Sequence, residues 1–179
     1  MVLRAAVPLV ISSLALGACS SDPIHSRQVD GLGGETSGVH EGPLHRPGQP
    51  CLACHGTAGP ADTEFALAGT VYQDPASMLP LPDARVHLID EDGKTYDAAT
   101  NCAGNFFIMN TDYRPTYPVW VKVFFGTAGG QPVFAKMGSP IYRDGSCATC
   151  HGDPPGPEAV GHVYWSPDPI AIPPSPSCQ

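Results

Sequence analysis

The sequence predicts an all-β protein, an antiparallel β-sandwich of the Ig-like or prealbumin-like kind with coil-rich segments at both ends. The first reason is that short stretches of β-branched and aromatic residues alternate with turn residues between positions 64 and 137. The second is that 20 glycines and 21 prolines among 179 residues favour turns and extended segments over long helices. Short strands closed by tight turns bury their apolar sides most readily as two packed sheets.

Six strands are expected, each bounded by turn residues. In the second, Val86 and Leu88 alternate with Arg85 and His87, which is the period of a half-buried strand. The sequence DEDGK at positions 90–94 contains Asp-Gly and predicts a hairpin turn after this strand. Because antiparallel strands alternate in direction, an even number of them should start and finish at the same end of the sandwich. The expected strands are Phe65 to Tyr72, Ala84 to Asp90, Lys94 to Thr100, Phe106 to Met109, Pro118 to Gly126 and Pro132 to Lys136.

Three motifs follow one another within this central stretch, from about Glu64 to Lys136. They read LAGTVYQD, then LPDARVHLIDEDGK, then TNCAGNFFI. Their order of G-x-V, a proline-led A-x-V-x-L strand, D-x-x-G-K and G-x-F resembles that of carboxypeptidase regulatory-like and transthyretin-like β-sandwich domains. The resemblance implies a scaffold that has no catalytic activity of its own.

The N-terminus is typical of an export signal. Residues 1–18 combine one positive charge at Arg4 with an apolar run that is too short to span a membrane. The ending Leu16-Gly17-Ala18-Cys19 resembles the lipobox of bacterial lipoproteins, which implies that Cys19 is lipidated and becomes the first residue of the mature chain. The alternative is an ordinary signal peptide cut nearby. The protein is thus expected to be exported and lipid-anchored to the bacterial cell envelope, at the periplasmic or surface face of the outer membrane.

The rest of the chain is expected to form one domain. Residues 19–44 contain few apolar and many Gly, Ser and charged residues, and they predict a flexible tether. Residues 45–178 would form a single domain, with the sandwich at about 64–137. The formal net charge is −8 and no basic cluster occurs, so nucleic acid is not expected as a partner.

The sequence PCLACHG at positions 50–56 returns as SCATCHG at positions 146–152. C-x-x-C-H is the attachment signature of c-type haem, in which two thiols bond to the porphyrin vinyl groups and the adjacent histidine binds the iron. The signal for export supplies the compartment in which such attachment takes place. Two covalently attached haem c groups are therefore expected, bound through Cys51, Cys54, Cys147 and Cys150, with His55 and His151 as the proximal iron ligands.

Two other kinds of site compete with this interpretation. Four cysteines could bind one zinc ion, but zinc motifs do not explain a histidine directly after the second cysteine in both copies. A C-x-x-C pair could be a thioredoxin-like redox centre, but that centre expects a βα setting, and no helical pattern follows CLACHG.

The second axial ligand of each iron is a further expectation. For the first haem His45 is favoured, because the Pro47-Gly48 turn could fold it over the distal face, and His40 is its rival. For the second haem Met137 and His162 both remain open. Methionine opposite histidine raises the haem potential relative to two histidines.

Two cysteines remain once Cys19 and the motifs are set aside. In an oxidising compartment Cys102 and Cys178 are expected to form one disulfide, which would hold the proline-rich C-terminal tail against the domain. The alternative is two separate thiols, since pairing geometry cannot be deduced from sequence.

Together, the two motifs and the lipobox resemble those of small dihaem c-type cytochromes of the bacterial envelope. This resemblance implies single-electron transfer between redox partner proteins, with no catalytic residues and with the lipid anchor as the contact to the membrane. One alternative is a haem enzyme such as a peroxidase, although such enzymes resemble longer chains. Another is a binding module that recognises a saccharide or wall polymer, but Trp120 and Trp165 are expected in the core and predict no aromatic platform.

Overall fold

The computed structural model describes residues 22–35, 38–152 and 159–166, together with the single positions 155, 157, 168, 172, 175 and 178. The expected leader at 1–18 and Cys19 lie outside these residues. No helix among the described residues has the length and apolar character needed to cross a membrane. The elements in chain order are α1 (Pro23–Gly31), α2 (Leu52–His55), β1 (Phe65–Tyr72), β2 (Arg85–Ile89), β3 (Thr95–Ala99), β4 (Asn105–Met109), β5 (Trp120–Ala128), β6 (Gln131–Lys136), the 3-10 helix η1 (Cys147–Thr149) and β7 (Val163–Tyr164).

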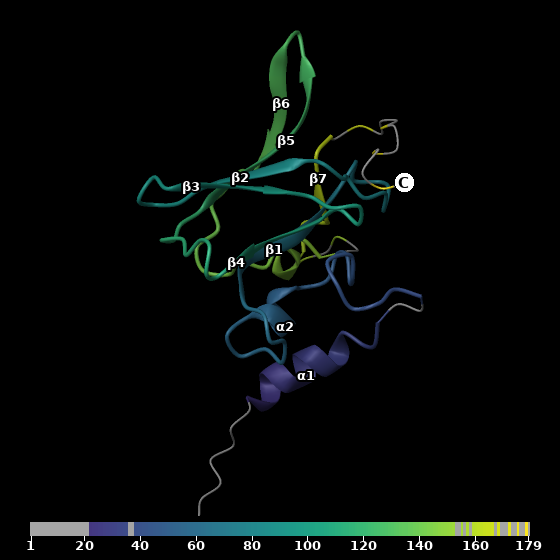
Figure 1. Cartoon of the computed structure of the whole chain (residues 1–179), viewed down its shortest axis with the longest axis vertical. Helices are drawn as coiled ribbons and strands as arrows, with labels where there is room; N and C mark the ends of the chain where they lie inside the picture. The colour runs from purple at the N-terminus through teal and green to yellow at the C-terminus, as the bar shows by residue number, and fades with distance from the viewer. Residues whose placement is uncertain are drawn as a thin grey trace, which may run out of the picture.

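The strands form two sheets that pack as a sandwich, which confirms the predicted fold class (Figure 1). One sheet has the order β4-β1-β7 and the other the order β3-β2-β5-β6. Each of the six expected strands is present. β5 begins two residues later than expected, because the backbone of Val119 pairs instead with Ile141, outside the sheet.

One strand was not predicted. β7 pairs in parallel with the end of β1, so the sandwich is antiparallel in all pairs but this one. Two residues are too few to produce a periodic pattern in sequence, and only the return of the chain to the edge of β1 makes them a strand.

The core lies between the two sheets. Leu67 and Val71 of β1 meet Val86 and Leu88 of β2, and all four are fully buried. Since side chains alternate across a strand, the alternation of apolar and polar residues in β2 assigns one side to the core and the other to the outside. Burying each such side chain contributes about 1.5–3 kcal/mol.

The predicted hairpin turn follows β2. Asp90 accepts hydrogen bonds from the backbone amides of Lys94, at 2.8 Å, and Thr116, at 3.3 Å, while Gly93 adopts a φ of 75°. Burial alone would raise the pKa of Asp90, but these hydrogen bonds outweigh it and lower the pKa below its usual value.

Within the predicted flexible tether at 19–44, residues 23–31 are helical, which corrects the prediction for that stretch. Residues 23–31 form α1, whose first turn is capped by the Asp22 side chain accepting a hydrogen bond from the amide of Ile24 at 2.9 Å. Asp followed by Pro is a helix start signal, and it outweighs the polar composition. Arg46 then holds the end of this segment, because its guanidinium donates to the Glu35 carboxylate at 2.6 Å and to the Gly33 carbonyl at 2.8 Å.

The C-terminal end is connected to the sandwich by the disulfide that the cysteine count led us to expect. Cys102 and Cys178 are bonded, with their Cα atoms 5.4 Å apart and a separation of 76 positions in sequence. Of the two tryptophans expected in the core, Trp165 is confirmed there and Trp120 is not. Trp165 packs against the core. Trp120 is 47% exposed on the outer side of the four-stranded sheet, because side chains alternate along a strand and the next residue, Val121, faces the core.

Candidate functional site

Both C-x-x-C-H motifs fold into a single helical turn. In the first, α2, the amide of His55 donates to the carbonyl of Cys51 at 2.9 Å. In the second, the amide of His151 donates to the carbonyl of Cys147 at 2.8 Å. Residues at i, i+3 and i+4 are neighbours on one face of such a turn, so the spacing alone brings both thiols and the imidazole of each motif together.

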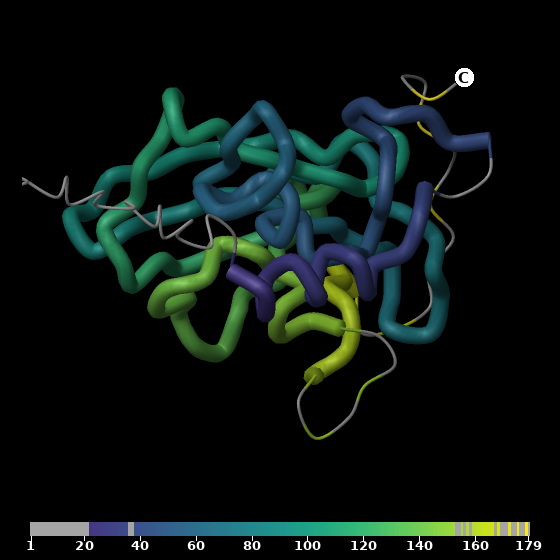
Figure 2. The backbone as a smooth tube through the Cα atoms, turned by 90° about the horizontal axis from the view of Figure 1, so that it is seen from below, coloured from purple at the N-terminus to yellow at the C-terminus, as the bar shows by residue number. Residues whose placement is uncertain are grey.

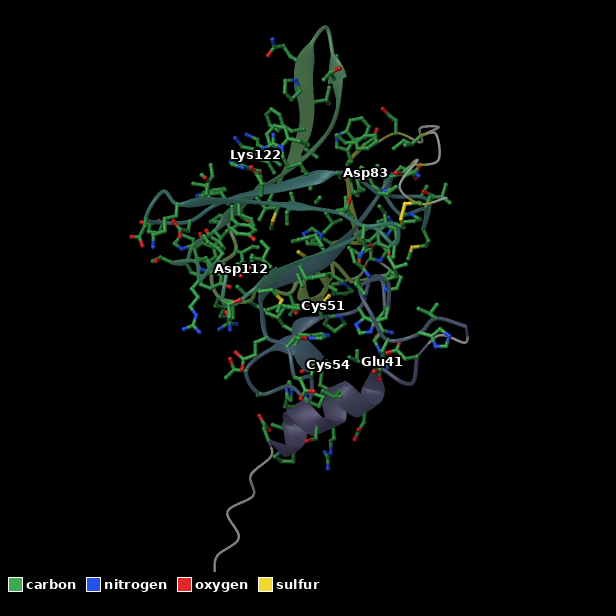
Figure 3. All side chains as sticks on the ribbon, in the orientation of Figure 1. Glu41, Cys51, Cys54, Asp83, Asp112 and Lys122 are labelled. Carbon is green, nitrogen blue, oxygen red and sulfur yellow. A yellow bond between two sulfur atoms is a disulfide. The ribbon has the colours of Figure 1, made fainter. Side chains whose placement is uncertain are left out.

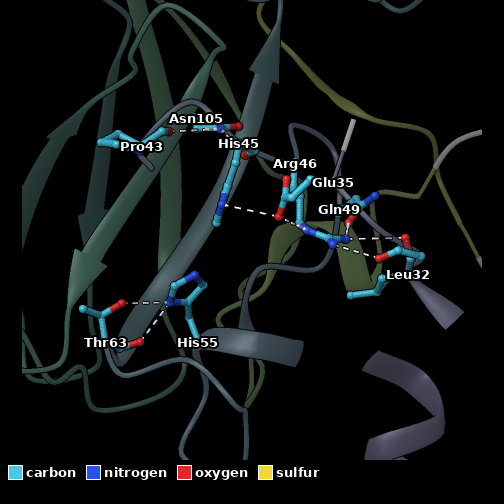
Figure 4. A network of polar contacts seen from close by, with 10 residues as sticks. Leu32, Glu35, Pro43, His45, Arg46, Gln49, His55, Thr63 and Asn105 are labelled. Carbon is cyan, nitrogen blue, oxygen red and sulfur yellow. Dashed lines mark hydrogen bonds and ion pairs between the residues drawn. The ribbon is translucent and has the colours of Figure 1, made fainter. Parts of the chain in front are cut away.

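The two motif histidines make the same hydrogen bond. His55 Nδ1 lies 2.9 Å from the Thr63 carbonyl oxygen and 3.0 Å from the Thr63 Oγ1 (Figure 4). His151 Nδ1 lies 3.0 Å from the Gly161 carbonyl oxygen. A carbonyl oxygen can only accept, so Nδ1 is the protonated nitrogen in each neutral ring and Nε2 carries the lone pair. This is how proteins orient a histidine that binds a metal ion through Nε2.

The first motif borders a cavity of about 720 Å³ between α2, the segment that follows α1, and the strands β1 and β4. This volume lies within the range of small-molecule and cofactor sites. Cys51, Cys54 and His55 line it on one side, with His45 and Phe65 beside them. Figure 3 places Cys51 and Cys54 between this sheet and α1.

His45 lies beside the histidine of the first motif. Its ring centroid is 5.8 Å from that of His55, and the ring planes are tilted by 48°. Its Nδ1 is buried and has no hydrogen-bond partner, and the nearest carboxylate oxygen belongs to Glu35 at 3.8 Å (Figure 4). A half-buried imidazole that lines the cavity beside the motif histidine and whose Nδ1 makes no hydrogen bond fits an iron ligand.

The outer side of the three-stranded sheet holds the turn that carries His45. The amide of Gly48 donates to Thr70 Oγ1 at 2.7 Å, and Asn105 Nδ2 donates to the carbonyl of His45 at 2.9 Å. Gly48 has a φ of 78°, and a Cβ there would lie 2.6 Å from the Tyr72 hydroxyl. Only glycine combines this backbone conformation with so close an approach to the sheet.

Aromatic rings form one wall of the same region. The ring of His55 stacks on Phe65 at 4.2 Å, and Phe65 stacks on Phe107 at 5.0 Å. The flat apolar wall and the two thiols suit a large planar group such as a porphyrin, and on these observations the residues of the first motif fit a covalently attached haem.

The second motif is attached to the edge of β1 that does not pair with β4. The amide of Ala68 donates to the carbonyl of Gly145 at 3.0 Å, and Ser146 pairs in parallel with Ala68. Gly69 lets Cys147 approach, since a Cβ at that position would lie 2.7 Å from both the Cβ and the Sγ of Cys147. Cys147 packs against the core, whereas Cys150 is exposed.

The two motifs are neighbours, as the even strand count predicted. Seen from below, α1 and the blue segment of the first motif lie beside the yellow-green segment of the second (Figure 2). Burial raises the pKa of the Cys147 thiol to about 12, with a smaller contribution from nearby Cys51, and burial likewise raises the pKa of Cys51 to about 11. Such thiols are protonated at neutral pH, which does not favour thioredoxin-like chemistry.

The structure does not place either proposed second ligand of the second haem against His151. Met137 packs against the hydrophobic core, and His162 is buried with its Nε2 2.9 Å from the carbonyl oxygen of Asp74. His40 is exposed and His87 pairs with Asp97 on the outside of β2, at 2.7 Å. Within the described part of the chain, which includes all four motif cysteines, no three His, Cys, Asp or Glu residues gather as a metal site.

Sequence reasoning missed the partners of the motif histidines. The Thr63 and Gly161 carbonyls are backbone groups, which carry no side-chain signature in sequence. The aromatic stack and the Glu35–Arg46 pair were also missed, although Phe65 lies at the start of a predicted strand. No protein-family model matches the chain, and no curated protein or solved structure is significantly similar to it.

Proposed function

We propose that this protein is a dihaem c-type cytochrome that transfers single electrons between redox partners. In this proposal Cys51 and Cys54 bind one haem and Cys147 and Cys150 the other, with His55 and His151 as proximal ligands. Export, a lipid anchor at Cys19 and a place at the outer membrane of a bacterial envelope belong to the same proposal.

The observation that carries the proposal is the shared geometry of two motifs almost a hundred residues apart. In each, a histidine donates its Nδ1 proton to a backbone carbonyl, at 2.9 and 3.0 Å, so that Nε2 is the nitrogen able to bind iron. A histidine that served only to fill space would have no reason to share this orientation with its counterpart in the other motif.

The residues of the chain would have distinct tasks. The cysteines tether the haem, the Thr63 and Gly161 carbonyls orient the histidines, and the stacked Phe65 keeps water from one wall. When bound, haem supplies an iron that changes its oxidation state by one electron. His45 is proposed as the second axial ligand of the first haem, and the choice between Met137 and His162 for the second stays open.

The proximity of the two motifs supports electron passage between them. Cys51 lies close enough to Cys147 to contribute to its raised pKa, and both motifs contact β1. Sites this close should titrate as a coupled pair, with two reduction steps that belong to the pair rather than to either haem alone.

The experiment is haem stoichiometry in protein produced together with a c-type haem maturation system. Denaturing mass spectrometry should show two covalent haem additions, and the pyridine haemochrome spectrum and iron content should agree. The double variants Cys51→Ser/Cys54→Ser and Cys147→Ser/Cys150→Ser should each retain one haem.

The matched control is Cys102→Ser/Cys178→Ser, which also replaces two cysteines, but those of the disulfide rather than those of a motif. It should keep both haems. Stoichiometric zinc without haem absorbance would refute the proposal, and so would loss of haem in the control with retention in the motif variants.

A further inference from the structure

The outer side of the four-stranded sheet carries an unusual set of side chains. Side chains paired across strands share a face, so the register of β2, β3, β5 and β6 defines three rows. In one row Arg85 lies opposite Phe124 and Phe124 opposite Phe134; in the next His87 lies opposite Lys122 and Lys122 opposite Lys136; in the third Ile89 lies opposite Trp120. We call the residues Arg85, His87, Trp120, Lys122, Phe124, Phe134 and Lys136 the aromatic-cationic face.

The aromatic rings of this face lie open to solvent. Trp120 is 47% exposed and Phe134 is 48% exposed. Phe134 and Phe124 have ring centroids 5.2 Å apart, and the Arg85 guanidinium lies 4.1 Å above the ring of Phe124. Solvent-facing positions of a sheet normally carry polar residues, so aromatic rings in the two rows on either side of the lysine row mark a binding surface.

The charges of this face are arranged at a cost. Lys122 and Lys136 occupy directly paired positions, and like charges opposite one another destabilise a sheet. Asp97 forms ion pairs with Arg85 and His87, at 3.0 and 2.7 Å. Among the described residues neither lysine has an ion pair with a carboxylate, so a bound anion would relieve their repulsion.

The location separates this face from the haem motifs. Figure 3 shows Lys122 at the base of the β5–β6 hairpin, on the side of the sandwich away from Cys51, Cys54 and α1. Three of the nine lysine and arginine residues gather there in a chain of net charge −8. An anionic partner would therefore be attracted to this face and repelled by most of the remaining surface.

We propose that the aromatic-cationic face binds an acidic polysaccharide, a linear glycan with carboxylate-bearing sugar rings. The rows lie about 6.7 Å apart, twice the rise per residue of a strand, so aromatic rings flank the lysine row on both sides. A sugar ring can lie flat on the exposed Trp120 while its carboxylate meets Lys122 or Lys136, and Phe134 adds apolar contact beside Lys122, whose Nζ lies 5.4 Å from the Phe134 ring centroid. A protein partner is less favoured, because protein interfaces are depleted in lysine. A nucleic acid is less favoured, because two lysines on an acidic protein do not match its charge density. The acidic glycan is therefore the favoured ligand.

The test uses the full mature chain in detergent, with polygalacturonate as the probe and calorimetry or affinity electrophoresis as the measurement. Binding should weaken as salt concentration rises. Lys122→Gln/Lys136→Gln should weaken it at least about tenfold and reduce its salt dependence, and Trp120→Ala should weaken it at least about fivefold. Phe134→Ala serves as a second aromatic variant if Trp120→Ala fails to fold.

Matched controls lie elsewhere on the molecule. Arg27→Gln/Arg114→Gln removes the same charge from exposed sites, and Met78→Ala shortens an exposed apolar side chain, so both should bind as the wild type does. Absence of polygalacturonate binding would overturn the proposal. So would equal binding of dextran sulfate, a thymidine oligonucleotide or anionic phospholipid vesicles with no effect of Trp120→Ala, because that result would assign the face to charge alone. Since the face is remote from the motifs, neither result depends on haem content.

Discussion

Replacing Gly69 with alanine tests how the second motif is held against the sandwich. The added Cβ would lie 2.7 Å from the Cβ and the Sγ of Cys147 and 3.2 Å from the Cε1 of Phe106, whereas ordinary contact begins at 3.4 Å. Because β1 is paired on both edges, the strand cannot shift freely to relieve the overlap. Overpacking of this kind costs about 1–3 kcal/mol.

Urea denaturation should therefore show a free energy of unfolding lower by about 1–3 kcal/mol, or a melting temperature lower by about 2–4 °C for each kcal/mol in a chain of this length. Gly138→Ala is the matched control, because a Cβ there meets no atom within 4 Å. It should change stability by less than about 0.5 kcal/mol.

A second measurement locates the disturbance. In protein made without haem maturation, iodoacetamide should label Cys147 faster in Gly69→Ala than in the wild type, relative to the exposed Cys150 of the same molecule. If stability and Cys147 labelling both match those of Gly138→Ala, the contact between the second motif and β1 is not as described and the reasoning fails.

Three further predictions concern the disulfide of the C-terminal tail, the proposed second iron ligand of the first haem, and the stability of the protein at acid pH. Replacing Cys102 and Cys178 by serine opens a loop closed over a sequence separation of 76, so the free energy of unfolding should fall by up to about 4.5 kcal/mol in urea denaturation. A fall of less than about 1 kcal/mol would contradict the disulfide, and so would free thiols at both positions of the wild-type protein in peptide mass spectrometry. His45→Met should raise one of the two reduction potentials in a spectroelectrochemical titration and leave the other nearly unchanged, and two unchanged potentials would remove His45 from the iron. Because the pKa of Asp90 is lowered in the folded state, its ionised carboxylate stabilises the fold fully above about pH 4, the pKa of Asp in an unfolded chain, and this stabilisation is lost as the pH falls through the lower folded value. Asp90→Asn should therefore flatten the pH dependence of the unfolding free energy in this range. An unaltered acid profile would exclude the effect.

The local features of this protein could be predicted from its sequence. The alternation in β2, the Asp-Gly turn after it and the i, i+3, i+4 spacing of each C-x-x-C-H motif are short-range patterns, and each restricts the backbone over a few residues. The neighbourhood of the two motifs followed from counting strands, because antiparallel topology links strand number to the end at which the chain emerges.

Most of the misjudged features involve contacts between distant segments, whereas the Asp22 cap of α1 is a local signal that was overlooked. Polar composition predicted a tether where Arg46 and the Asp22 cap hold a folded helix, and β7 exists only because residues 163–164 return to β1. Trp120 was assigned to the core by residue type, although the strand phase places it outside. Phase depends on the exact register of a strand, and a single residue of shift reverses every side chain.

By itself, the sequence determined the kinds of elements and the chemical groups of both motifs, because strand periodicity and the turn of each C-x-x-C-H segment arise from neighbouring residues. The tertiary structure alone decided which carbonyl oxygens orient His55 and His151, that His45 lies beside His55, and that aromatic and cationic side chains of β2, β5 and β6 share one outer surface. These juxtapositions join residues from separate segments, and they depend on strand order and register, which only the packing of the whole chain sets.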